Sequence, residues 1–117
     1  MINLFNKCIS DMEDNTKKND IVNDIDIIND MIDPRYKLKC TCVMCPEQYD
    51  VIDTKTNESC GYIRLRWGEL TCEYPDCSGI ILYSHTFQHE CGCFRDTKER
   101  ILHLTACVEL IKCANEI

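Results

Sequence analysis

The segment YIRLRWGELTCEY, residues 62–74, sets the strongest limit on the fold of this chain. Apolar and polar side chains alternate on both sides of a central Trp-Gly pair, which is the period of a half-buried β-strand. A two-residue turn at that pair places Leu65 opposite Leu70 and Arg66 opposite Glu69, so both faces of the two strands agree. The same register pairs Arg64 with Thr71 and Ile63 with Cys72. We therefore predict an antiparallel hairpin.

Further strands and a helix follow from the segments on either side. YDVID at residues 49–53 is separated from the hairpin by the turn-rich TKTNES, and GIILYS at residues 79–84 follows the turn YPDCSG. Near the C-terminus, Asp96 is a candidate helix N-cap with Glu99 at the capping-box position. We expect a helix of about five turns from residue 97. Its apolar stripe consists of Ile101, Leu104, Val108 and Ile111.

Pro34 marks a boundary between this region and an acidic N-terminal arm. Isoleucines recur at helical spacing before the proline, as Ile21, Ile25, Ile28 and Ile32, and Asn19 or Asp20 can cap their helix. An earlier stripe of Ile2, Phe5, Ile9 and Met12 predicts another helix, with residues 13–20 as a linker. We interpret residues 1–33 as a helical arm packed on its own domain, residues 34–117; a docking helix for a partner is the alternative. The predicted fold is α+β, with a small antiparallel sheet of four or five strands packed by the C-terminal helix.

The charge of the chain bears on its partners and location. The net charge is −7, and residues 1–33 carry −5 of it, with three lysines against eight acids. Nucleic-acid binding usually needs a basic face, so the balance disfavours that class. The N-terminus lacks the pattern of a secretory signal, and no apolar run is long enough to span a membrane. We expect a cytoplasmic or nuclear protein, with packaging in a virion as an alternative.

Eleven cysteines dominate the chemistry that the sequence offers. At this density a secreted chain is usually cross-linked by disulfides, whereas a cytosolic chain usually uses its thiols for metal or redox chemistry. Eight of the eleven lie between residues 40 and 93. Apart from Cys60, they form three clusters, which consist of Cys40, Cys42 and Cys45; Cys72 and Cys77; and His85, His89, Cys91 and Cys93.

A structural zinc site is the leading interpretation of these clusters. Cys42 and Cys45 have the C-x2-C spacing of a turn that presents two thiolates to one metal. We expect the intervening hairpin to return Cys72 and Cys77 to their side. This arrangement resembles a zinc ribbon over residues 40–83, although Tyr74 stands where the second knuckle of that family has its first ligand. The alternate ligands are Cys40, His85, His89, Cys91 and Cys93.

Two other uses of the thiols remain open. Cys42 and Cys45 have the spacing of a redox dithiol, for which Pro46 would open a short helix that activates the first thiolate. Alternatively, local disulfides form a structural protein, for instance of a viral particle; the candidate pairs are Cys72–Cys77, Cys91–Cys93 and Cys107–Cys113. Cys8, Cys107 and Cys113 are also plausible core residues, because free cysteine is often buried.

The polar face of the hairpin is the candidate binding surface outside the cysteines. Tyr62, Arg64 and Arg66 lie on one face and suit recognition of a protein or an anion. The simpler interpretation is a solvated face with cross-strand ion pairs. We place Trp67, the only tryptophan, in the core. With no phosphate-binding loop in the sequence, we expect a small non-enzymatic protein-interaction module that is stabilised by one zinc ion.

Overall fold

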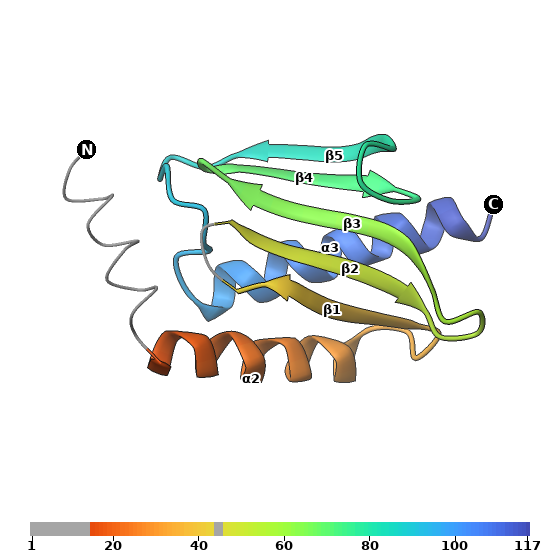
Figure 1. Cartoon of the computed structure of the whole chain (residues 1–117), viewed down its shortest axis with the longest axis horizontal. Coiled ribbons are helices and arrows are strands. Elements are labelled where there is room, and N and C mark those ends of the chain that lie inside the picture. Colours follow the sequence, from red (N-terminus) through yellow and green to blue (C-terminus); the bar gives the residue numbers. More distant parts are fainter. Residues whose placement is uncertain (1–14, 44–45) are drawn as a thin grey trace.

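The computed structural model describes residues 15–43 and 46–117 as one α+β fold, as predicted. A single sheet of five antiparallel strands has the order β1-β2-β3-β4-β5, and two helices flank it (Figure 1). The elements are α2 (Asn15–Met31), β1 (Tyr36–Cys42), β2 (Glu47–Asp53), β3 (Glu58–Arg66), β4 (Glu69–Tyr74), β5 (Ile80–Thr86) and α3 (Thr97–Asn115). The predicted helix over residues 2–12 lies outside the described residues, as do Cys8 and Cys45.

The strands form a simple meander, so each turn joins two neighbouring strands. Successive turns therefore lie at alternating ends of the sheet (Figure 1). All the pairs predicted between β3 and β4 are present, including Leu65 with Leu70 and Arg66 with Glu69. Trp67 and Gly68 form the turn between them, both with positive φ, at 54° and 76°. The alternating pattern was sufficient to specify this register, because a slip of one residue would expose every inward side chain.

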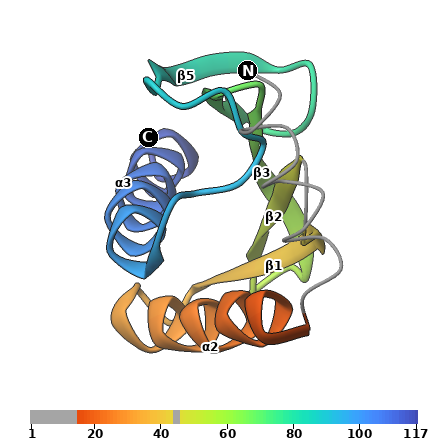
Figure 2. The same ribbon diagram turned by 90° about the vertical axis from the view of Figure 1, so that its left-hand side faces the viewer.

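The core lies between the sheet and α3. Figure 2 shows α3 across one face of the sheet and α2 along the β1 side. The inward side chains of the sheet include Leu38, Tyr49, Val51, Ile63, Leu65, Leu70 and Cys72, all of them fully or almost fully buried. Helix α3 contributes Leu104, Cys107, Val108 and Ile111 to the same cluster. The opposite face of the sheet carries the polar half of each alternating strand.

Helix α2, which is the part of the N-terminal arm that the structure describes, packs on the rest of the described chain. Ile21, Ile25 and Ile28 are buried in the common core. The helix begins at Asn15, however, and the predicted start at residue 19 or 20 was wrong. Residues 15–20 belong to the helix and are no linker, because no proline or glycine stops a helix there and lysine is a good helix former.

Helix α3 begins where its capping residues predicted. The Asp96 carboxylate accepts a hydrogen bond from the Glu99 amide at 2.8 Å. This contact satisfies one of the amide groups that have no partner within the first turn of a helix. Among the described residues, neither helix is both long enough and apolar enough to cross a membrane.

Candidate functional site

Three connecting segments meet at one end of the sheet. The Glu47 amide donates to the Gly92 carbonyl at 2.8 Å, and the Gly68 amide donates to the Cys91 carbonyl at 3.0 Å. The Phe87 amide donates to the Gly68 carbonyl at 2.8 Å. The loop that follows β5 is thereby attached to the first residue of β2 and to the β3–β4 turn. This end of the sheet is also where Cys42 ends β1.

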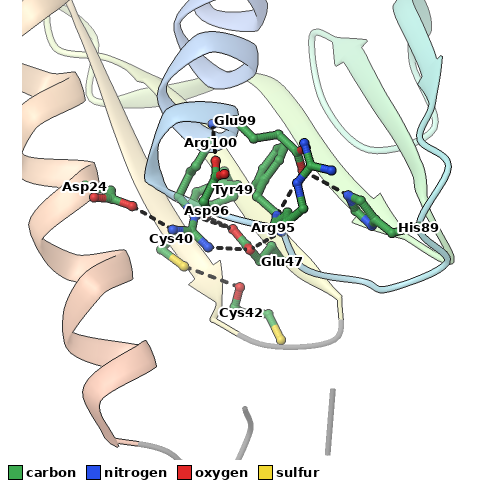
Figure 3. Close-up of polar contacts among 11 residues, drawn as sticks. Asp24, Cys40, Cys42, Glu47, Tyr49, His89, Arg95, Asp96, Glu99 and Arg100 are labelled. Atoms are coloured by element: carbon green, nitrogen blue, oxygen red, sulfur yellow. Dashed lines mark hydrogen bonds and ion pairs between the residues drawn. The ribbon is translucent and has the colours of Figure 1, made fainter. Parts of the chain in front are cut away.

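Glu47 is the polar centre of this end, and its side chain is completely buried. The carboxylate accepts bonds from Arg100 Nε at 3.1 Å and from Arg100 Nη2 at 2.9 Å. It also accepts the Phe94 amide at 2.8 Å and the Tyr49 hydroxyl (Figure 3). A buried carboxylate is tolerable only when its oxygens are paired in this way.

Arg100 extends the network to α2. Its Nη1 donates to Asp24 Oδ2 at 2.6 Å, and both side chains are almost fully buried (Figure 3). Although burial by itself lowers the pKa of Arg100, the bonds to Glu47 and Asp24 raise it overall. The guanidinium thus stays charged and joins α2, β2 and α3.

Sequence reasoning missed this network, although two signals were present. Glu47 is two residues before Tyr49 and four before Val51 in one strand, so all three point inward. Arg100 is four residues before Leu104 in α3, which places both on the buried face of the helix. Two inward charges of opposite sign on neighbouring elements predict an ion pair.

Cys40 lies close to this network but is not a reactive thiol. Its Sγ donates to the Cys42 carbonyl at 3.3 Å. Burial, followed by the negative charge of Glu47, raises the pKa of Cys40 to about 11. In the absence of a metal ion, this thiol therefore favours its protonated form.

Cys91 and Cys93 flank Gly92, the residue that bonds to Glu47. Cys93 is buried, and Cys91 is disulfide-bonded. Cys42 and Cys93 also have interaction partners. The backbone bond between Glu47 and Gly92 brings the Cys91–Cys93 segment to the connection that contains the C-x2-C sequence.

The structure does not bring Cys72 and Cys77 to Cys42. Cys72 is buried on β4, with its Sγ 3.6 Å from the Cys107 carbonyl. Cys77 is exposed in the β4–β5 turn, at the opposite end of the sheet from the β1–β2 connection (Figure 1). The chain passes through β2, β3 and β4 between these two connections. Because neighbouring strands run in opposite directions, three strands take the chain from one end of the sheet to the other. The expectation that the chain returns Cys77 to Cys42 was therefore wrong.

The three histidine rings lie around the ring of Phe87, with centroid distances of 4.6 Å for His85, 5.0 Å for His89 and 4.8 Å for His103. His89 Nε2 lies 2.9 Å from Glu99 Oε1, and the buried His89 Nδ1 has no hydrogen-bond partner in the described part of the chain. His85 lies on β5, with its ring centroid 5.1 Å from that of His103 on α3. Burial and the neighbouring His85 lower the pKa of His103, whereas Glu99 acts in the opposite direction.

Pro46 does not open a helix, which corrects one expectation for the redox alternative. The next residue, Glu47, is the first residue of strand β2. The chain continues as strand β2 from this point, and the inward side chain of Glu47 accepts a hydrogen bond from Arg100. The helix N-terminus that was expected to activate the Cys42 thiolate is therefore missing after Pro46.

The polar hairpin face is formed as predicted, but Trp67 is not in the core. Its side chain is 67% exposed. An open hollow of about 340 Å³ is lined by Arg64, Arg66, Trp67, Glu69 and Thr71. Tyr62 lies farther along β3 on the same face, and burial raises its pKa. Within residues 15–43 and 46–117, neither Arg64 nor Arg66 forms an ion pair, so the expected cross-strand ion pairs are absent there.

The remaining cysteines divide between core and surface. The predicted disulfides Cys72–Cys77 and Cys107–Cys113 are not formed, because all four of these cysteines are free thiols. Cys107 is buried on α3, as predicted, and Cys60 is buried on β3. Cys113 was expected in the core but is exposed, because it lies off the buried face of α3.

Comparison with known proteins gives no independent guide to the site. Neither a protein-family model nor a curated protein nor a solved structure matches the chain. In the part of the chain that the structure describes, which does not include Cys45, no three His, Cys, Asp or Glu side chains are grouped to hold a metal ion.

Proposed function

We propose that the protein is a small non-enzymatic protein-binding module whose cysteine-rich end is held by one structural zinc ion. The proposed ligands are Cys42 and Cys45 from the β1–β2 connection and Cys91 and Cys93 from the loop after β5. The observation that carries this proposal is the 2.8 Å bond from the Glu47 amide to the Gly92 carbonyl. It joins the two segments that hold the two cysteine pairs.

The chemistry of structural zinc supports this choice of ligands. Such sites take four ligands in a tetrahedron, and they usually draw two from each of two adjacent turns. The disulfide at Cys91 means that its sulfur has another sulfur within bonding distance. Once reduced, Cys91 can supply a thiolate to a zinc ion. A reducing compartment, cytoplasmic or nuclear, would favour the metal form.

The same disulfide favours a second candidate function. In an oxidising setting such as a virion, Cys91 would remain covalently linked, and the protein would be a disulfide-bonded structural module. Within residues 15–43 and 46–117, which do not include Cys45, no observation favours the thiol-redox alternative for the Cys42–Cys45 pair.

Native mass spectrometry of reduced, zinc-replete protein, with and without a chelator, tests the zinc proposal. We expect one zinc ion per chain, and we expect its removal to weaken the near-ultraviolet circular dichroism signal. Cys91→Ser and Cys93→Ser should each lose the metal. The matched control is Cys77→Ser, which alters an exposed cysteine at the other end of the sheet and should retain it.

The two candidates give different results in this experiment. A reduced protein that binds no zinc under these conditions contradicts the zinc proposal. A disulfide that persists in protein purified without reductant, with no metal bound, supports the second candidate. Loss of zinc from Cys77→Ser would show that the ligand set is wrong.

A further inference from the structure

The β3–β4 hairpin carries the hollow described above on the face that α3 does not cover. Arg64 and Arg66 are two residues apart on β3, so their Cα atoms lie about 7 Å apart on one face. Thr71 lies directly opposite Arg64 on β4. Two arginine side chains and one threonine thus line the same concave surface.

These polar groups have unused hydrogen-bonding capacity. Arg64 and Arg66 form no ion pair within the described residues, although Glu69 is directly opposite Arg66. The Thr71 hydroxyl is buried and has no hydrogen-bond partner among the described residues. Guanidinium groups match the two oxygens of a carboxylate in geometry and charge.

Trp67 is an independent sign of binding at this place. Two-residue hairpin turns with positive φ at both positions favour Asn-Gly, and a tryptophan at the first position is costly. Neither the turn nor the core requires this side chain, because it is largely exposed. Backbone strain of this kind is concentrated at functional sites, and exposed tryptophans are frequent anchors of protein interfaces.

The turn that presents Trp67 is firmly held. Gly68 bonds through its amide to Cys91 and through its carbonyl to Phe87. A Cβ atom at Gly68 would lie 2.2 Å from the His89 carbonyl oxygen, so the loop is in close contact with the turn. The loop after β5, which contains Cys91 and Cys93, therefore supports the tip of the β3–β4 hairpin directly.

We propose that this hollow binds an acidic peptide segment of a partner protein. A carboxylate of the peptide would accept bonds from Arg64 and Arg66, and an apolar neighbour would pack on Trp67. The proposal deepens the proposed function, on which it rests, by naming the chemistry of the partner. A polyanion such as a nucleic acid fits less well, because Glu69 lines the same hollow and the chain has a net charge of −7.

Random peptides displayed on phage, selected on the folded protein, provide the probe. We expect enriched sequences to carry Asp or Glu next to an apolar residue. Synthetic copies of the enriched peptides should change the emission of Trp67, the only tryptophan. Arg64→Gln and Arg66→Gln should each weaken binding about tenfold or more, which is the effect of losing a hydrogen bond to a charged group. The matched control is Lys98→Gln, an exposed cation outside the hollow, and it should bind normally.

Several results would overturn the proposal. These are a selection without acidic enrichment, arginine variants that bind as the unchanged protein does, and tighter binding to single-stranded DNA than to the peptides. Zinc content measured on the same samples separates this proposal from the previous one. If the protein contains zinc but selects no acidic peptides, only the peptide site is contradicted. If the protein contains no zinc but still selects acidic peptides, only the zinc site is contradicted.

Discussion

Arg100 Nη1 lies 2.6 Å from Asp24 Oδ2, and this contact joins the two helices inside the protein. Together with the paired bonds from Arg100 to Glu47, it places one cation between two buried carboxylates. The stability of the cysteine-rich end depends on this arrangement, because the Glu47 carboxylate also accepts the Phe94 amide of the loop after β5.

Replacing Arg100 should destabilise the fold strongly. Arg100→Met leaves Glu47 and Asp24 as buried carboxylates without a cation, and we expect a loss of about 3 to 5 kcal/mol in the free energy of unfolding. Urea denaturation measures the change. Arg95→Met is the control, since Arg95 is exposed and its ion pair with Glu99 is at the surface. Equal stability of the two variants would contradict the central role of Arg100.

Replacing Trp67 should separate stability from binding. Trp67→Asn puts a residue that tolerates positive φ at the first turn position, so the free energy of unfolding should rise by about 1 kcal/mol. The same variant should lose the contact for the apolar part of the peptide. Thermal denaturation and peptide titration in parallel test both effects. A less stable variant would show that the tryptophan stabilises the turn.

Two thiols with raised pKa values, the partly buried Cys40 and the buried Cys60, should make the stability of the fold sensitive to alkaline pH. Burial raises the pKa of Cys40 and of Cys60 from 9.0 to about 11. The folded state therefore favours the protonated thiols, and this contribution is complete below pH 9 and is lost as the pH rises towards 11. Urea denaturation across this range should show falling stability, with a smaller fall in Cys60→Ala. An identical fall in that variant would assign the effect to other groups.

The His85–His103 pair should make the stability of the fold decrease at acidic pH. Burial and His85 lower the pKa of His103 below 6.5, so the unfolded state binds the proton more readily. The contribution of neutral His103 to the free energy of unfolding is present above pH 6.5. It is lost as the pH falls through the pKa of His103 in the folded state. Nuclear magnetic resonance titration of the imidazole signals measures this pKa. His85→Gln should raise it only partly, because burial remains; no change would exclude the influence of His85.

Much of the fold could be predicted from local patterns. The alternation in residues 62–74 specified the β3–β4 register, and the Asp96 cap specified the start of α3. Both depend on residues that are close in sequence, where periodicity and turn geometry leave few choices. The start of α2 was less predictable, because helix ends depend on weak propensities.

The candidate sites were predicted unevenly for a physical reason. Arg64 and Arg66 were identified because they share a strand face with a known register. Whether Cys77 lies near Cys42 depends on the number of strands between the β1–β2 connection and the β4–β5 turn. The three strands β2, β3 and β4 place Cys77 at the end of the sheet opposite Cys42.

Local sequence thus determined the elements, the register of the hairpin and the polar face with its two arginines. The tertiary arrangement determined that the Cys91–Cys93 loop, and not Cys77, lies beside the C-x2-C connection that begins at Cys42. It also buried Glu47 with Arg100 and left Trp67 in solvent. These outcomes depend on contacts between residues far apart in sequence, and such contacts are set by the packing of whole elements against one another.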